Sequence, residues 1–265
     1  YVAEGGAYDG KIVERNAAGE EVRPLDISIT KNVLGLFINS AVLLVIMMSC
    51  VRWYKKHPLE DGAPKGGVGM IEATVLSIYN DVIKGCIGEN YRRYAPYLLT
   101  AFFFVLVNNL MGLIPIFPGG ANVTGNIAIT LVLALCTFVL TNVYGTKAYW
   151  KEIFWPDVPT WLKAPIPMMP LIEFFGIFTK PFALMIRLFA NIMAGHAAVL
   201  SLVAIIFITV KSGPVINGSM TVVSVAFSIF MNALEILVAF IQAYVFTMLS
   251  AVFIGLSQVK EHAEK

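Results

Sequence analysis

The sequence predicts an all-α membrane protein with about five membrane-crossing helices and one interfacial amphipathic helix. Hydrophobic residues make up 58% of the 265 residues, and the mean hydropathy is +0.76, well above that of a soluble domain. Several apolar stretches reach the roughly 20 residues that a helix needs to cross a bilayer. The last two stretches run for more than 40 residues without a polar loop, so we expect very long helices there.

We divide the chain into an extramembrane N-terminal tail, residues 1–32, and a membrane domain, residues 33–265. The tail is polar and rich in glycine. The membrane domain begins with a helix at 33–53, which ends in an aromatic and basic cluster typical of a membrane boundary. Residues 68–93 place apolar and charged side chains on opposite faces of a helix, which favours a position at the membrane interface rather than across it.

Two hairpins complete the predicted membrane domain, one formed by helices at 96–117 and 122–147 and one by helices at 165–211 and 217–259. Each helix of the second hairpin is about 63–68 Å long at roughly 1.5 Å per residue, twice the ~30 Å thickness of the hydrocarbon. Broken spans and a strongly tilted hairpin both accommodate this length. We favour the tilted hairpin, because ordinary tilts near 20° cannot absorb the mismatch.

Charge and cysteine content predict the orientation and exclude some partners. With five crossings and the N-terminus outside, the cytoplasmic or matrix side holds twelve Lys and Arg residues and the outer side five, as the positive-inside rule requires. A net charge of only +2 argues against a nucleic-acid partner. Cys50, Cys86 and Cys136 are widely spaced and lack a CxxC motif, so we expect them to pack as apolar residues, with no metal site and no cofactor.

Arg187 lies in the middle of the fourth membrane segment, among apolar residues. An arginine at the membrane centre costs about 2.5–3.5 kcal/mol on insertion scales, which indicates an ion path, a counter-ion or a buried pair. Glu173, Lys180 and Arg187 recur every seven residues and share one helix face, which Asn191 joins one turn later. His196 points the opposite way. Glu173 and Lys180 also fit a purely structural pair.

The fifth segment carries a matching line of polar residues. Thr221, Ser228, Glu235 and Gln242 recur every seven residues, and Asn232 lies one turn before Glu235. Polar lines on two lipid-buried helices predict that the helices pack on each other and enclose hydrated space. Gln242 and Asn191 also fit hydrogen bonds that only hold helices together.

The residue types indicate how protons would move through such a space. Glu235 and His196 can both gain and lose a proton, whereas Arg187 stays protonated in a protein. Arg187 is therefore suited to act as a fixed positive barrier, and a proton needs a mobile carboxylate on another subunit to pass it. His196 also fits an ordinary buried histidine bonded to a carbonyl.

Taken together, these residues resemble a known family, subunit a of the F-type ATP synthase. The resemblance covers roughly residues 96–265 and depends on a specific set of residues: Glu173, Lys180-Pro181, Arg187-Leu188-Phe189-Ala190-Asn191, Gly195-His196, Glu235 and Gln242-Ala243. It implies a non-catalytic stator subunit that contacts a rotating ring of c-subunits in an energy-transducing membrane, either the bacterial inner membrane or the mitochondrial inner membrane. It also implies b-type peripheral-stalk subunits as partners and the lipid bilayer as surroundings.

The resemblance further implies two aqueous proton half-channels and a role for each matching residue. These are Arg187 opposite the ring carboxylate, Gln242 beside it, Asn191 near the arginine, His196 and Glu235 in the outer half-channel, and Glu173 in the inner one. Lys180, Ser228 and Asn232 are further candidates for proton translocation. In a familiar bacterial pattern the acid and imidazole of the outer pair are exchanged, which keeps one of each in the path.

Two other classes of function fit parts of the pattern. A self-contained secondary transporter would also place charged residues near the membrane centre, although the sequence shows no convincing internal repeat. A structural membrane anchor would tolerate apolar replacements at the polar positions. The residue types do not distinguish proton transport from sodium transport. The sequence contains no HExxH motif, which argues against a metalloprotease.

Overall fold

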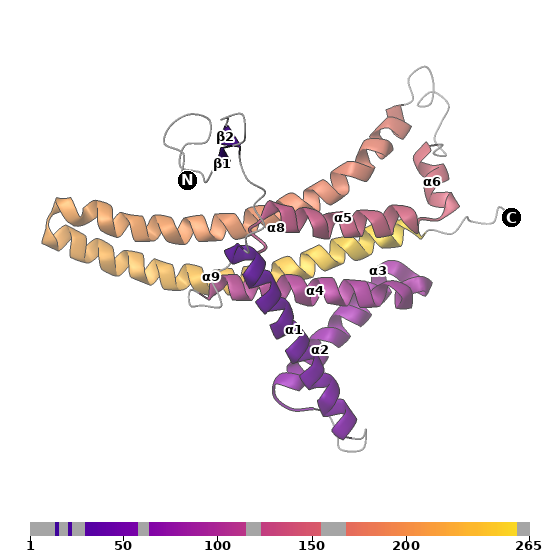
Figure 1. Ribbon diagram of the computed structural model, residues 1–265, viewed down its shortest axis with the longest axis horizontal. Coiled ribbons are helices and arrows are strands. Elements are labelled where there is room, and N and C mark those ends of the chain that lie inside the picture. The colour runs from indigo at the N-terminus through magenta and orange to yellow at the C-terminus, as the bar shows by residue number, and fades with distance from the viewer. Residues whose placement is uncertain are drawn as a thin grey trace.

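A computed structural model describes residues 14–15, 21–22, 30–57, 64–114, 123–154 and 168–258, and these are almost wholly helical (Figure 1). The α-helices are α1 (Lys31–Lys56), α2 (Gly67–Ser77), α3 (Gly85–Ile87), α4 (Tyr91–Leu113), α5 (Ile127–Val143), α6 (Lys147–Phe154), α8 (Met168–Thr209) and α9 (Pro214–Ser257). A π-helix and two 3₁₀ turns connect them: η2 (Ile78–Lys84), η3 (Gly88–Asn90) and η4 (Val210–Ser212). In the described part of the tail, two-residue strands β1 (Glu14–Arg15) and β2 (Glu21–Val22) pair antiparallel.

Four of the described helical segments are long and apolar enough to cross a membrane, or up to five if α5 and α6 count as one span. The break between α5 and α6 bends the chain by 97°. The prediction of an all-α membrane protein with about five crossings is therefore confirmed.

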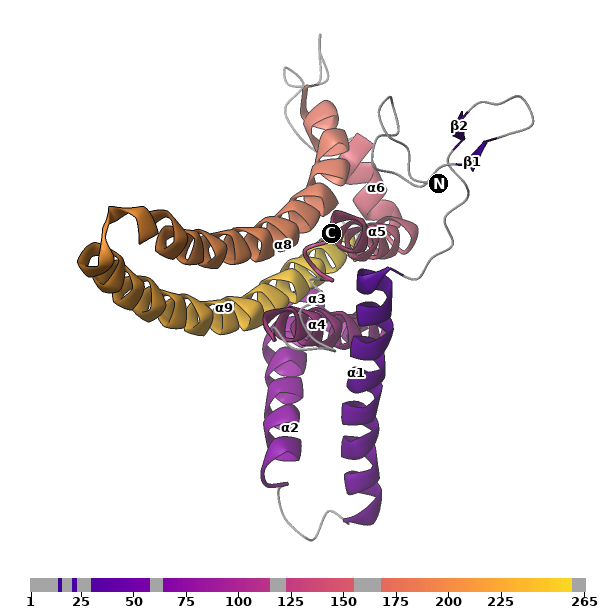
Figure 2. The ribbon, with the colours of Figure 1, turned by 60° about the vertical axis from the view of Figure 1, so that its left-hand side comes forward.

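Helix α1 stands at a steep angle to the four long helices α4, α5, α8 and α9 (Figures 1 and 2). Its N-terminus is capped by Thr30, whose hydroxyl accepts a hydrogen bond from the Val33 backbone N–H at 3.4 Å. It crosses α4 through a buried amide pair, in which Asn39 Nδ2 donates to Asn108 Oδ1 at 2.9 Å. Burying one amide against another satisfies groups that would otherwise be costly inside a membrane protein.

The predicted interfacial helix is divided differently from the prediction. The structure breaks the helical path at Gly88–Asn90, and α4 already begins at Tyr91, with Pro96 inside it. The expected boundary at 93–96 was wrong, because Leu98 and Phe102 are fully buried in the core and their packing outweighs the single hydrogen bond that Pro96 removes. The segment 68–93 is amphipathic as predicted, since Ile78 and Val82 are buried whereas Lys84 is exposed. Its position at a membrane surface stays a prediction.

Helix α9 packs between α4 and α8, and α5 packs on α8. One apolar cluster joins them and includes Leu98, Phe102, Leu184, Leu188, Phe246 and Ile254. Three hydroxyl groups inside this core are linked, since the Tyr97 hydroxyl of α4 lies 2.9 Å from the Thr137 hydroxyl of α5, which lies 3.2 Å from the Ser250 hydroxyl of α9. The predicted helix at 122–147 is shorter, and begins at Ile127 after an Asn126 cap.

The two long C-terminal helices form the predicted hairpin. They contain 42 and 44 residues and are joined at Gly213, whose φ of +103° favours glycine, so α9 starts at Pro214 instead of the expected residue 217. Beyond the other helices the hairpin continues as an arm, residues 200–228, that curves in Figure 2. Ser224 is the one buried residue of the arm.

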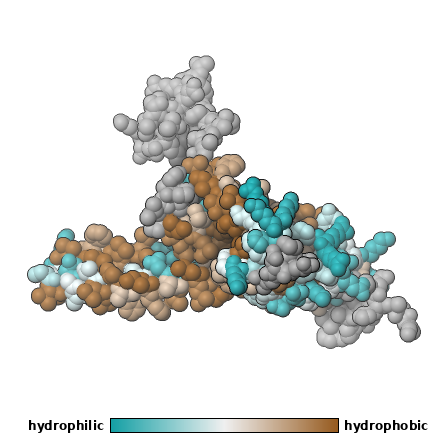
Figure 3. Space-filling model, turned by 90° about the horizontal axis from the view of Figure 1, so that it is seen from below, coloured by the Kyte–Doolittle hydropathy of each residue, from teal (hydrophilic) through white to brown (hydrophobic). Residues whose placement is uncertain are grey.

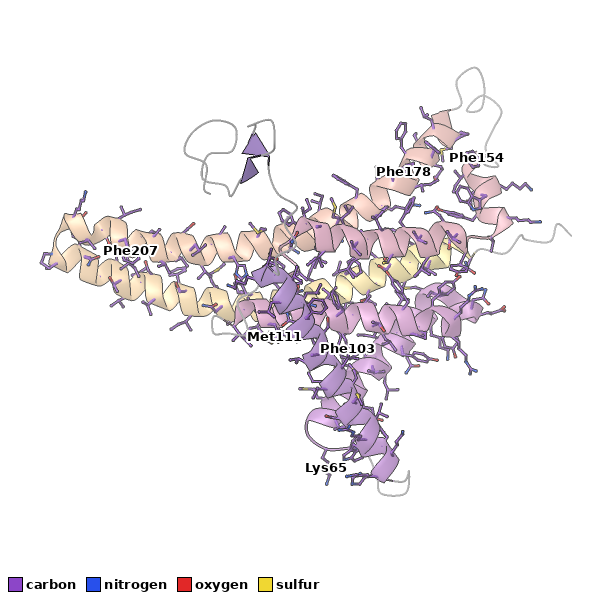
Figure 4. All side chains as sticks on the ribbon, in the orientation of Figure 1. Lys65, Phe103, Met111, Phe154, Phe178 and Phe207 are labelled. Carbon is purple, nitrogen blue, oxygen red and sulfur yellow. The ribbon has the colours of Figure 1, made fainter. Side chains whose placement is uncertain are left out.

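The surface of the arm is mostly apolar, with polar residues at its tip, whereas hydrophilic residues gather at the opposite end of the molecule (Figure 3). Phe207, for example, lies on the arm with 73% of its surface exposed (Figure 4). Side chains of this kind are stable when they face lipid or an apolar partner. The tilt of the hairpin relative to a membrane stays a prediction.

Candidate functional site

Arg187 lies on the outward side of α8. Its neighbours Leu184, Met185 and Leu188 are buried against the core, whereas the arginine is exposed. It forms no hydrogen bond or ion pair with any residue in the described ranges. The interpretation of Arg187 as half of a buried pair within this chain is therefore not supported there, and the guanidinium is free to meet a group from outside the chain.

Asn191 and Gln242 join the two long helices one turn from Arg187. Asn191 Nδ2 donates a hydrogen bond to Gln242 Oε1 at 2.6 Å, and the Gln242 side chain is buried. The sequence placed these amides on the facing polar lines of the two helices, and the structure brings them together. The bond holds the backbone of α8 close to α9 next to the arginine.

His196 and Glu235 form the second pair between α8 and α9. The distance between His196 Nδ1 and Glu235 Oε1 is 3.9 Å, and their side chains are 30% and 10% exposed. His196 makes no hydrogen bond to a carbonyl among the described residues, so the interpretation of an ordinary buried histidine lacks its partner. An acid and an imidazole at this distance are within reach of one bridging water molecule.

A cavity of about 280 Å³ opens beside this pair, between α8, α9 and the end of α4. Its polar lining comes from four side chains, Asn109, Asn191, His196 and Glu235, and the rest is apolar or backbone. This volume exceeds what a single water molecule needs, and the polar groups provide hydrogen-bond partners. Arg187 does not line it, whereas Asn191, one turn later on α8, does.

Gly195 allows Glu235 to approach α8 closely. A Cβ at this position would stand 2.5 Å from Glu235 Oε1 and 3.1 Å from its Cδ. We expect Gly195→Ala to push the carboxylate away from His196, at a cost of about 1–3 kcal/mol for such overpacking, and to slow proton pumping by about tenfold. Gly218→Ala is the matched control, because a Cβ there meets no atom within 4 Å.

ATP-driven acidification of membrane vesicles, normalised to the amount of assembled protein, measures the effect of both glycine variants. Equal pumping rates for Gly195→Ala and Gly218→Ala would show that the position of the Glu235 carboxylate does not matter.

Glu173 and Lys180 lie apart from this cavity, near α6. Glu173 is partly buried and interacts electrostatically with Tyr149. Lys180 borders a smaller hollow between α5, α6, α8 and α9, which Tyr149 and Asn142 also line. Glu173 and Lys180 form no ion pair with each other in the described chain, so the structural-pair interpretation is not supported. Nor do the described residues contain a cluster of three or more His, Cys, Asp or Glu side chains that could hold a metal ion.

Two further candidates, Ser228 and Asn232, are not brought to the site. Asn232 is exposed and donates only to the Ser228 carbonyl of its own helix, at 2.9 Å. Neither residue lines the cavity or hydrogen-bonds to α8 within the described ranges.

Asn109 is a residue of the site that the sequence analysis missed. It is 2% exposed and lines the cavity from α4, and its Nδ2 donates to the Ala239 carbonyl at 3.2 Å. Its Oδ1 accepts no hydrogen bond from the described residues, an omission that costs about 1–3 kcal/mol for a buried group. The signal available in the sequence was the Asn108–Asn109 pair inside an apolar helix, where amides are rare without a partner.

Comparison with known proteins identifies the family of this chain. Residues 34–255 match the family model described as ATP synthase A chain. ATP synthase subunit a of Chlorobium phaeobacteroides is 47% identical over 97% of this chain and 75% of its own length. Subunit a of Chloroherpeton thalassium is 45% identical over 91% of this chain and 70% of its own, and that of Myxococcus xanthus is 39% identical over 90% and 75%.

These relatives are bacterial, and the residues that the family model matches, 34–255, include all the site residues described above. With its apolar membrane-spanning helices and a family match over most of its length, this chain belongs to the ATP synthase A chain family, the subunit a of the membrane sector.

Proposed function

We propose that this chain is the stator subunit that conducts protons past a rotating c-ring, with the cavity beside His196 and Glu235 as one aqueous half-channel. The observation that carries the proposal is the exposed Arg187, unpaired within the described chain, less than three helical turns from an acid–imidazole pair that lines a cavity. A permanent charge of this kind in a membrane segment needs a partner, and a ring carboxylate supplies one.

The path begins in the cavity. Water carries a proton to His196 and Glu235, which exchange it because both groups can take up and release protons. A carboxylate on the ring accepts the proton, becomes neutral and can then move through lipid, where a charged group would be too costly. The driving force is about 2.3 kcal/mol for each charge that crosses 100 mV.

Arg187 acts at the point where the ring carboxylate must be charged again. Its guanidinium does not deprotonate, so it favours the ionised carboxylate and drives off the last proton. The same charge repels protons that would otherwise pass directly from one half-channel to the other. The Asn191–Gln242 hydrogen bond keeps α8 and α9 together beside it.

The second half-channel would leave on the opposite side, through the region of Glu173, Lys180 and Tyr149. Both charged residues are only partly buried and lie on the α8 segment that contacts α6. With the basic residues on the cytoplasmic side, the C-terminus lies inside and the N-terminus outside. The c-ring and b-type stalk subunits are the partners, and ATP chemistry takes place on other subunits.

Reconstitution of the complete complex in lipid vesicles tests the proposal. We expect ATP addition to acidify the vesicle interior and an imposed proton gradient to drive ATP synthesis, whereas the purified chain alone transports nothing. Substrate uptake by vesicles that contain only this chain would instead show a secondary transporter. Varying sodium at fixed pH identifies the ion.

A further inference from the structure

We propose that Asn109 of α4 is a further residue of the proton path, which holds a water molecule in the cavity beside Glu235. The Asn39–Asn108 hydrogen bond, one residue away, acts as the positioning contact. The inference rests on the proposed function, and it adds α4 and α1 to a path otherwise built from α8 and α9.

Two buried acceptors border the same cavity without a partner among the described residues. They are Asn109 Oδ1 and Glu235 Oε1. A buried acceptor is normally hydrogen-bonded, and these two need a donor. His196 Nδ1, at 3.9 Å from Glu235 Oε1, is too far for a direct hydrogen bond. A water molecule can donate two hydrogen bonds and takes two to four partners in a polar cavity, so water here would supply the donors that both oxygens need.

The Asn109 side chain is fixed in the orientation that this role needs. Its Nδ2 is committed to the Ala239 carbonyl of α9, and this bond directs the other end of the amide, Oδ1, to a different partner. Next to it, Asn108 Nδ2 donates to the Phe104 carbonyl at 2.8 Å and Oδ1 accepts from Asn39 of α1. The neighbouring amides thus tie α4 to α9 on one side and to α1 on the other.

The obvious alternative is that Asn109 only fastens α4 to α9. That role uses its Nδ2 donor alone, whereas the proposed role uses the Oδ1 acceptor. The two roles therefore predict different results for variants that keep or remove an oxygen at this position, and different access of water.

The first experiment measures water access in the intact reconstituted complex. Cys50, Cys86 and Cys136 are replaced by serine, and Asn109→Cys is treated with a small charged methanethiosulfonate, which reacts with thiols that water reaches. Val105→Cys is the matched control, because Val105 lies one turn earlier on the same helix, is 0% exposed and does not line the cavity. We expect Asn109→Cys to react at least about tenfold faster. Equal reaction rates for Asn109→Cys and Val105→Cys would refute the proposal that water reaches position 109.

The second experiment measures proton conduction and its pH profile in vesicles that carry the otherwise native complex. We expect Asn109→Leu to slow conduction about tenfold, and Asn109→Asp to keep most of it with an altered pH profile, because the acid retains acceptor oxygens and adds a titrating group. The conduction rate of Asn39→Leu should lie between those of the native complex and Asn109→Leu.

A fastening role would instead make the leucine and aspartate variants of Asn109 equally slow, with the native pH profile. If Glu235→Gln abolishes conduction while Asn109→Leu leaves it unchanged, only this inference fails. Unchanged conduction in Glu235→Gln would remove the proposed function itself.

Discussion

Replacing Arg187 by alanine is expected to abolish coupled ATP synthesis and ATP-driven proton pumping. Arg187 is the positive charge next to the Asn191–Gln242 contact, and it has no partner of its own among the described residues. Removing one member of a buried charge pair costs about 3–5 kcal/mol. Since 1.4 kcal/mol is a factor of ten, the proposed interaction with a ring carboxylate should weaken at least about 100-fold.

The same substitution should also open a passive leak. In the proposed mechanism the fixed charge separates two half-channels, so its removal should let protons pass directly between them, and an imposed gradient should decay faster in vesicles that contain the variant. Arg187→Lys keeps a charge but loses the planar guanidinium and can deprotonate, so we expect residual pumping at most.

Ile186→Ala is the matched control for Arg187, because Ile186 is the adjacent, partly exposed residue of α8 and carries no charge. It should pump at nearly the native rate. Normal synthesis in Arg187→Ala, at the same level of assembled complex, would exclude the rotary mechanism.

Glu235→Gln is expected to have the second largest effect. Glutamine has the shape of glutamate and fills the same space beside Gly195, but it cannot exchange a proton. Transfer by a positioned acid or base contributes about 10²–10⁴-fold to a rate, so proton conduction should fall by about 100-fold. Stopped-flow measurement of vesicle acidification, at equal complex content, provides the number.

Two controls separate loss of the proton from loss of structure. Glu152→Gln changes an exposed carboxylate on α6, outside the long hairpin, and should leave conduction unchanged. Exchanging the pair, with His196→Glu and Glu235→His in one chain, restores one acid and one imidazole at the same two positions. We expect it to recover more conduction than Glu235→His alone, and the reverse order would contradict a proton relay.

Most of the fold follows from local patterns in the sequence. The length of α8 and α9 and the turn between them could be predicted, because more than 40 apolar residues without a polar loop leave few other solutions and Gly213-Pro214 marks the turn. The boundary near Pro96 could not, since a proline rule is local and the burial of Phe102 is not. The packing of α9 between α4 and α8 depends on contacts that periodicity does not encode.

The candidate site divides in the same way. Heptad spacing identified Glu235 and Gln242, and the structure gives them His196 and Asn191 as neighbours on α8. Asn232, one turn before Glu235, is exposed, and its amide donates to the Ser228 carbonyl of its own helix. Asn109 belongs to a helix more than 120 residues before Glu235, and only the folded chain brings the two to one cavity.

The exposed surface of α8 also constrains how the complex is made. An 18-residue apolar stretch of this helix contains no fully buried residue, although the helix packs on α9. A copy of the chain without its neighbours therefore exposes a large apolar surface along this hairpin. Subunits that lack their partners in this way are natural targets of quality-control proteases. Synthesis of this subunit should therefore be matched to its neighbours, and its half-life should shorten sharply whenever they are missing.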